Sequence, residues 1–191
     1  MAIITKLLTL EEYLARDNTA EKHYELIAGN LTEIPPKSPQ NAEIAIKLLL
    51  IFARFVSSRL LRCKDTEIVV SGSRATVRLP DLIVLTEDLA NDLYSNNRST
   101  IGIDMLPPAL VVEVVSPGKV NRDRDYRYKR SEYAARGIAE YWIVDPEEEK
   151  LTILLLNDGL YEEDVYQDDK AIASALFPQL QLTAKEIFIS E

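Results

Sequence analysis

The segment Leu110-Val-Val-Glu-Val-Val115 has five aliphatic residues among its six, and most of them are β-branched. Such residues favour a β-strand, and the lack of polar alternation predicts that both faces of this strand are buried. Glu113 interrupts the run, and a buried carboxylate is costly unless it is paired or binds a metal ion. Two interpretations stay open from this pattern: a structural ion pair with Arg74 or Arg78, or a functional carboxylate.

Segments of strand and helix character lie on both sides of this strand. Residues 24–27 and 31–34 alternate around Ala28-Gly29, which predicts a two-residue hairpin. Further strands are predicted at residues 67–71, 75–78, 81–85, 141–144, 151–156 and 161–165, with a turn at Gly72-Ser73. Helices are predicted at residues 10–16, 121–136 and 182–189, and a polar loop at residues 91–103.

The longest helix is predicted to begin at Ser38, a good N-cap, with Pro39 at its first position, and to continue to about Arg62. It is apolar around most of its circumference, so we expect it to be buried on more than one side. Helices around a mixed β-sheet place the chain in the α/β (α+β) class. The 191 residues suit a single domain spanning residues 1–191.

Composition and charge narrow the class of protein. A net charge of −9 and a pI near 4.8 argue against a general nucleic-acid coat protein. Residues 119–130 nevertheless hold six basic residues against two acids, a local basic cluster that could face DNA. Cys63 is the single cysteine, which excludes an internal disulfide and suits a reducing cytoplasm. The sequence shows neither a signal-peptide pattern nor a membrane span, so we expect a cytoplasmic protein.

Asp81 and Glu113 form a candidate metal site. Asp81 directly follows Pro80 and opens an apolar strand, and Glu113 lies 32 residues later in a second buried strand. Adjacent strands would bring the two carboxylates together. Hard cations such as Mg²⁺ need a few such oxygen ligands, with water and a substrate phosphate completing the shell.

Lys129 is the third candidate. Tyr126, Lys129 and Tyr133 share one helix face, which predicts that the lysine points toward the core. The alternative is a lysine that extends past the tyrosines into water. Beside two carboxylates, this lysine could orient or deprotonate an attacking water, or stabilise charge on a phosphate, and Asp125 could pair with it.

Several motifs in order resemble those of one family. Asp125, Lys129 and Tyr133 fit a D-x(3)-K-x(3)-Y helix, and Glu140-Tyr-Trp-Ile-Val-Asp-Pro146 fits the specific EYW-x-VDP segment after it. The other matching segments are Leu8-Thr-Leu-Glu-Glu-Tyr13, Tyr24-Glu-Leu-Ile27, Leu79-Pro-Asp-Leu-Ile-Val84 and Val112-Glu-Val-Val-Ser-Pro117. Together they resemble the Uma2 family (DUF820) of restriction-endonuclease-like proteins, in the PD-(D/E)XK nuclease superfamily.

This resemblance implies a restriction-endonuclease-like core with Asp81 and Glu113 as metal ligands and Lys129 as the catalytic lysine. It adds the backbone carbonyl of Val114 as a ligand and Glu25 as a further acidic site residue, which the pattern alone would leave as an exposed strand glutamate. The superfamily's usual lysine position holds Val115, and Lys129 replaces it. Asn41 stands where family members often have histidine, so no site role is predicted for that helix start.

The predicted function is an endonuclease that hydrolyses DNA with Mg²⁺ or Mn²⁺. A homodimer is expected, as is common among relatives of this fold. Two alternatives stay open: a catalytically inactive nuclease-fold protein that binds nucleic acid or regulates, favoured by the global acidity, and a hydrolase of phosphorylated small molecules.

Overall fold

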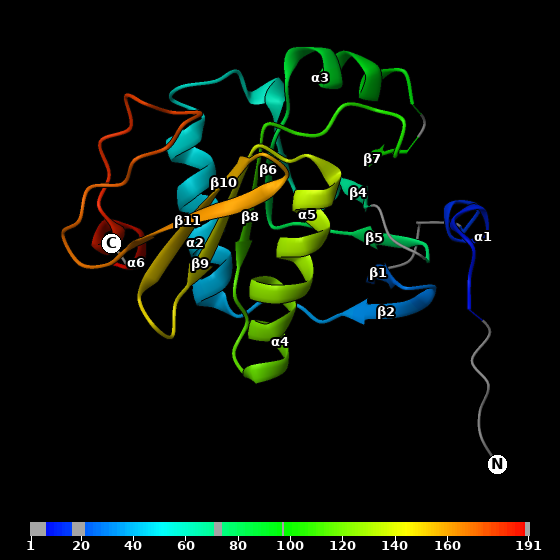
Figure 1. Ribbon diagram of the computed structural model, residues 1–191, viewed down its shortest axis with the longest axis horizontal. Helices are drawn as coiled ribbons and strands as arrows, with labels where there is room; N and C mark the ends of the chain where they lie inside the picture. The colour runs from blue at the N-terminus through cyan, green and yellow to red at the C-terminus, as the bar shows by residue number, and fades with distance from the viewer. Residues whose placement is uncertain (1–6, 17–21, 71–73, 97, 190–191) are drawn as a thin grey trace.

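The computed structural model of the protein describes residues 7–16, 22–70, 74–96 and 98–189 (Figure 1). The turn predicted at Gly72-Ser73 lies outside these residues. The strands are β1 His23–Ile27, β2 Asn30–Ile34, β3 Leu61–Cys63, β4 Glu67–Val70, β5 Thr76–Arg78, β6 Leu82–Val84, β7 Thr100–Ile101, β8 Leu110–Val114, β9 Glu140–Asp145, β10 Lys150–Asn157 and β11 Leu160–Tyr166. The helices are α1 Leu10–Leu14, α2 Pro39–Phe52, α3 Glu87–Tyr94, α4 Lys119–Asp123, α5 Arg130–Arg136 and α6 Ala184–Phe188, with a 3₁₀-helix at Ser58–Leu60 and a π-helix at Arg124–Lys129.

The strands form two mixed sheets rather than one. The larger has the order β11-β10-β9-β8-β6-β3, and the smaller has the order β2-β1-β5-β4-β7. Parallel pairing occurs between β8 and β9 and between β4 and β7, and the other pairs are antiparallel. Helices α2 and α5 lie on opposite faces of the larger sheet (Figure 1). The predicted α/β class with a mixed sheet flanked by helices is confirmed.

The central strand β8 is buried along its whole length, as its aliphatic sequence predicts. Leu110, Val112 and Val114 pack in the cluster that contains α2, whereas Val111 packs in the cluster that contains α5. Since side chains alternate along a strand, Glu113 points to the α5 face. The sheet therefore carries one carboxylate into the core on a single, defined side.

Helix α2 is shorter than predicted and is buried on one face only. It ends at Phe52, and the chain continues through the 3₁₀-helix into β3, which pairs antiparallel with β6. This strand pairing outweighs the helical pattern of the sequence after residue 52, so the predicted end near Arg62 is wrong. Ile46 and Leu50 are 57% and 63% exposed, which also corrects the expectation of burial on several sides. None of the described helices is long and apolar enough to cross a membrane.

The segment predicted as a polar loop at residues 91–103 contains regular structure. Helix α3 covers residues 87–94, and Thr86 caps it by accepting a hydrogen bond from the backbone N–H of Leu89. Leu89, Ala90 and Leu93 are buried along one face of α3. This apolar face stabilises the helix. The segment was predicted to be a loop because most of its other residues are polar.

Two turns have the backbone geometry that the sequence predicts. Ala28 and Gly29 have φ values of 49° and 84°, the left-handed conformations of the tight hairpin turn between β1 and β2. Gly137 ends α5 with φ 82°. The helix predicted from about residue 121 begins at Lys119 and passes through the π-helix before α5.

Glu140 in β9 joins the sheet to the C-terminal segment. Its buried carboxylate accepts hydrogen bonds from the Trp142 indole (2.6 Å), the Ser174 hydroxyl (2.7 Å) and the backbone N–H of Leu176 (2.9 Å). The glutamate and tryptophan of the EYW motif therefore have a structural role in this chain.

We expect Glu140→Ala to lower the free energy of unfolding by about 3 kcal/mol, because it leaves several buried donors without an acceptor. Urea denaturation measures this change. The matched control is Glu162→Ala in β11, whose side chain is exposed and should change stability by less than about 0.5 kcal/mol. Equal denaturation midpoints for the two variants would contradict this role of Glu140.

Candidate active site

Strands β6 and β8 bring Asp81 and Glu113 together. Leu82 pairs with Val112 in an antiparallel register, and extending this register by one residue sets Asp81 opposite Glu113. Both side chains are almost fully buried, with exposed fractions of 3% and 1%, and both line the same cavity. The two carboxylates therefore lie on adjacent strands and face one cavity, as the sequence predicts.

Glu113 accepts two short contacts from the α5 side. The Lys129 ammonium lies 2.7 Å from its Oε1 atom, and the Tyr133 hydroxyl donates to the same oxygen at 2.7 Å. Arg78, one of the partners considered from the sequence, instead binds Glu25 and Glu132. Burial raises the pKa of Glu113 to about 7; Lys129 opposes this shift, and nearby carboxylates add to it. Burial therefore makes Glu113 easier to protonate than an exposed glutamate, although Lys129 favours its charged form.

Lys129 projects inward from the end of the π-helix and is 2% exposed, so the alternative of a water-facing lysine is wrong. Besides Glu113, its ammonium lies 3.5 Å from the carboxylates of both Glu25 and Asp125. Burial disfavours the ammonium, but the three carboxylates outweigh burial and raise the pKa of Lys129 above its ordinary value. Lys129 thus remains charged. Short π-helical segments recur at functional sites. This one supplies Asp125 and Lys129, two of the four charged residues in contact here; the other two are Glu25 and Glu113.

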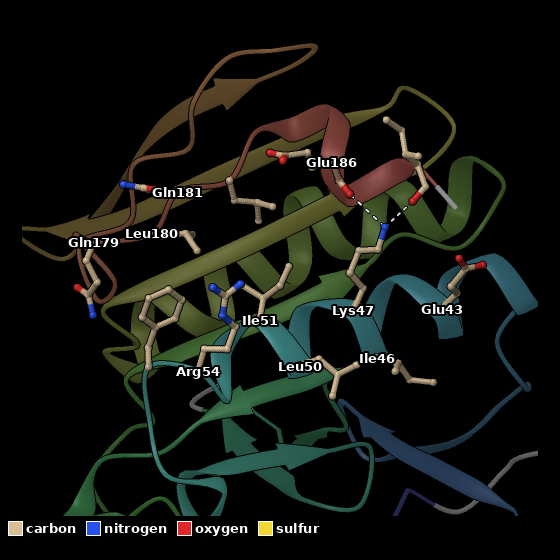
Figure 2. Close-up of a pocket in the computed structure, with 13 residues that line it drawn as sticks. Glu43, Ile46, Lys47, Leu50, Ile51, Arg54, Gln179, Leu180, Gln181 and Glu186 are labelled. Carbon is tan, nitrogen blue, oxygen red and sulfur yellow. Dashed lines mark hydrogen bonds between the residues drawn. The ribbon is translucent and has the colours of Figure 1, made fainter. Parts of the chain in front are cut away.

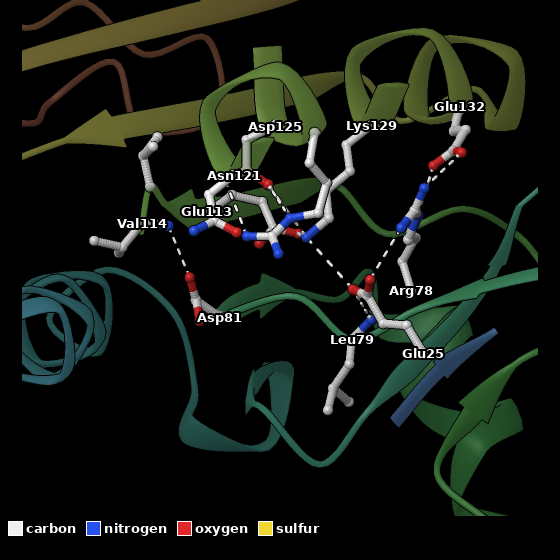
Figure 3. Close-up of polar contacts among 12 residues, drawn as sticks. Glu25, Arg78, Leu79, Asp81, Glu113, Val114, Asn121, Asp125, Lys129 and Glu132 are labelled. Atoms are coloured by element: carbon white, nitrogen blue, oxygen red, sulfur yellow. Dashed lines mark hydrogen bonds and ion pairs between the residues drawn. The ribbon is translucent and has the colours of Figure 1, made fainter. Parts of the chain in front are cut away.

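Glu25 is buried, so the interpretation from the sequence pattern alone, an exposed strand glutamate, is wrong. It accepts hydrogen bonds from the Arg78 guanidinium (2.9 Å) and the backbone N–H of Leu79 (3.1 Å). Arg78 in turn binds Glu132 of α5 through two nitrogens (Figure 3). Burial opposes the charged form of Glu25, yet Lys129, Arg78 and the Leu79 N–H outweigh it and lower its pKa to about 2. Glu25 is an ionised carboxylate that fixes Lys129 from the β1 side.

Asp81 is held against the end of β8. Its Oδ2 atom accepts a hydrogen bond from the backbone N–H of Val114 at 2.8 Å (Figure 3). The same oxygen lies 2.8 Å from the Lys37 ammonium, and Lys64 lies 4.0 Å from Oδ1. Lys37 also donates to the carbonyl oxygen of Val114 at 2.6 Å. One lysine therefore connects two of the three oxygen ligands that the family resemblance implies, Asp81 and the Val114 carbonyl.

These residues surround a small cavity of about 70 Å³. Besides the acids, its walls carry the cations Lys37, Lys64, Arg124 and Lys129. A larger groove of about 700 Å³ lies between α2 and the C-terminal segment. There the Lys47 ammonium contacts backbone oxygens of Glu186 and Ile189 (Figure 2). The small cavity is the candidate site, because its walls gather buried charges of both signs, whereas the α2 wall of the groove is solvent-exposed and mixes apolar with charged side chains.

Sequence reasoning missed the contribution of the start of α2. Lys37 precedes the Ser38 N-cap, and Asn41 donates to the carbonyl of Val115 at 2.9 Å and approaches that of Val114 at 3.5 Å. Both residues therefore contact the end of β8, close to Asp81 and Val114. The only sequence signal was the position of Asn41, where the family often has histidine.

The basic cluster at residues 119–130 is largely neutralised by nearby carboxylates. Arg122 binds Asp145 and Glu148, and Arg130 binds Glu163. The remaining pairs are Arg124 with Asp125, Arg127 with Asp123, and Lys129 with its three acids. The cluster therefore does not form the open basic surface that its composition suggested.

The oxygen donors at this cavity fit a hard divalent cation in their chemistry. Among the described residues, no group of three or more His, Cys, Asp or Glu side chains is arranged to hold a metal ion. The available donors are the Asp81 and Glu113 carboxylates and the Val114 carbonyl, all oxygens of the type that Mg²⁺ and Mn²⁺ prefer. The ammonium of Lys37 already stands between two of these oxygens as a cation.

Comparison with known proteins confirms the resemblance seen in the motifs. The Uma2 family, described as "Putative restriction endonuclease", matches residues 10–185. A solved structure, described as "a putative nuclease belonging to DUF820 from Anabaena variabilis ATCC 29413", has a TM-score of 0.71 and 18% identity. The alignment covers 95% of this chain and 97% of that one, and it shows the same fold. No curated protein matches the sequence. The chain belongs to the Uma2 family.

Proposed function

We propose that the protein is a divalent-metal-dependent endonuclease that hydrolyses phosphodiester bonds of DNA. The main support for this proposal is that Asp81, Glu113 and Lys129 all line one buried cavity. Two carboxylates on adjacent strands with a charged lysine beside them match the chemistry that phosphoryl transfer needs: a metal site and a fixed positive charge. Membership of the Uma2 family supports the same conclusion.

In this proposal Asp81, Glu113 and the Val114 carbonyl hold Mg²⁺ or Mn²⁺. When bound, such an ion polarises the phosphoryl oxygen and lowers the pKa of a coordinated water. The hydrogen bond from the Val114 N–H fixes the Asp81 carboxylate toward the end of β8. The Tyr133 hydroxyl orients Glu113 in the same way.

Lys129 acts through its charge and its N–H donors. Because the surrounding carboxylates raise its pKa, Lys129 stays an ammonium, which suits orientation of the attacking water and stabilisation of charge on the phosphate rather than proton abstraction. Glu25 is a positioning residue here: it holds Lys129 in place and is itself held by Arg78. The substrate phosphate would meet Asn121 and Arg124 at the cavity wall. A homodimer would present two such sites to the two strands of duplex DNA.

A catalytically inactive, nucleic-acid-binding or regulatory protein is the second candidate. Two observations favour it: the ion pairs that neutralise the basic cluster, and the small volume of about 70 Å³ between the proposed catalytic groups. Metal binding without turnover would support this candidate.

We expect the protein to nick supercoiled plasmid DNA with Mg²⁺ or Mn²⁺. Asp81→Ala and Lys129→Met should each lower the rate by about two to three orders of magnitude, since each removes a charged group from the reacting centre. The matched controls are Asp169→Ala and Lys22→Met, which remove exposed members of surface ion pairs and should leave the rate unchanged. The proposal is wrong if the wild-type protein does not nick DNA, or if both site variants nick it at the wild-type rate.

The raised pKa of Glu113 predicts that metal binding strengthens with pH. Below about pH 7 the carboxyl carries a proton that competes with the metal ion, and above it the carboxylate is free to bind. Calorimetric titration should therefore give a Kd for Mn²⁺ about tenfold lower at about pH 8 than at about pH 6. Glu113→Gln should bind weakly at both. An equal Kd for the wild-type protein at both pH values would exclude Glu113 as a ligand.

A further inference from the structure

Lys37 is the one basic side chain in the described chain that touches both Asp81 and the Val114 carbonyl. Its ammonium lies 2.8 Å from the Asp81 carboxylate and 2.6 Å from the carbonyl oxygen, and its side chain is 9% exposed. Neither contact is a surface ion pair of the kind that contributes little. The ammonium is a cation bound by two of the three groups that the proposed function assigns to a metal ion.

Lys37 and a metal ion cannot share these oxygens. Mg²⁺ binds oxygen at about 2.0–2.1 Å, so an ion on Asp81 and Val114 would fall in the space that the ammonium fills. Two cations at that separation also repel strongly in a buried site. Binding of the metal therefore requires the ammonium to leave.

We propose that Lys37 is a tethered cation that occupies the metal position in the metal-free protein and is exchanged for the divalent ion. This inference rests on the proposed function, since it concerns the same metal site. The exchange makes the ammonium a competitor: it balances the buried charge of Asp81 when no metal is bound, and it weakens the apparent affinity for metal.

The chain around Lys37 allows its side chain to move while its backbone stays in place. Pro36 precedes it, and Ser38 and Pro39 begin α2 directly after it, so the backbone of this segment is restricted. The flexible four-carbon side chain can swing without any change in α2. Asn41 contacts the carbonyls of Val114 and Val115 independently, so the end of β8 keeps its orientation when Lys37 leaves.

The displaced Lys37 ammonium could still bind the substrate phosphate at the cavity. Lys37 lines the cavity together with Asn121 and Arg124, where the proposed function places the substrate phosphate. A phosphate group in this position offers the ammonium a new anionic partner. Substrate binding and metal binding would then favour one another, because the same phosphate draws Lys37 away from Asp81.

Calorimetric titration of the full chain with Mn²⁺ tests the exchange without any measurement of activity. We expect Lys37→Met to bind Mn²⁺ at least about tenfold more tightly than the wild-type protein, because no ammonium has to be displaced. Lys64→Met is the matched control: it removes a lysine that also faces Asp81, but at 4.0 Å and with 34% exposure. It should change the Kd by less than about threefold if displacement, rather than net charge, controls affinity.

Thermal unfolding gives a second readout. Metal-free Lys37→Met should have a lower Tm than the wild-type protein, since Asp81 loses its counter-charge, and saturating Mn²⁺ should raise its Tm by more. Lys37→Gln, which keeps a polar side chain without the charge, should behave in the same way and replaces the methionine variant if that variant does not fold.

The outcomes separate this inference from the proposed function. If the wild-type protein and the Lys37 variants bind Mn²⁺ with equal Kd, or if the variants bind more weakly, the exchange is wrong and the metal site stands. If Lys64→Met tightens binding as much as Lys37→Met, net charge explains the effect and the exchange is also wrong. If none of the proteins binds Mn²⁺, both the exchange and the proposed metal site fail.

Discussion

The buried ion pair between Glu113 and Lys129 is the interaction on which the rest of the site depends. Its 2.7 Å contact joins the central strand β8 to the π-helix that precedes α5, at exposed fractions of 1% and 2%. A lone charge at either position would be strongly destabilising, because the core offers no water. Each group therefore compensates the buried charge of the other, and the pair ties the sheet to the helix.

This pair sets the charge balance of the whole cavity. Lys129 alone cannot neutralise its three carboxylates, and Arg78 supplies further positive charge through Glu25. On the opposite wall, Lys37 balances Asp81. The two walls differ in one respect: Lys129 is enclosed by side chains of the core, whereas Lys37 lies on a short connection before α2. The first arrangement suits a permanent charge, and the second suits a cation that can be replaced.

The sequence predicted the elements that local patterns specify and missed those that depend on tertiary contacts. Glu113 was recognisable because a carboxylate in an aliphatic strand needs a partner, and the tyrosine spacing correctly placed Lys129 inside. The end of α2 was wrong because β3 pairs with β6 across the sheet, which no local pattern reveals. Lys37 was missed for the same reason: a lysine between prolines is ordinary in sequence, and only the fold sets it on Asp81 and Val114.

We propose that a divalent ion binds between Asp81, Glu113 and the Val114 carbonyl. The most direct measurement is an anomalous difference map from crystals of the protein soaked in Mn²⁺. We expect a peak bounded by these three groups, with the Lys37 side chain turned away from Asp81 and Val114. The absence of a peak there in fully soaked crystals, or a peak bound only by surface carboxylates, would contradict it.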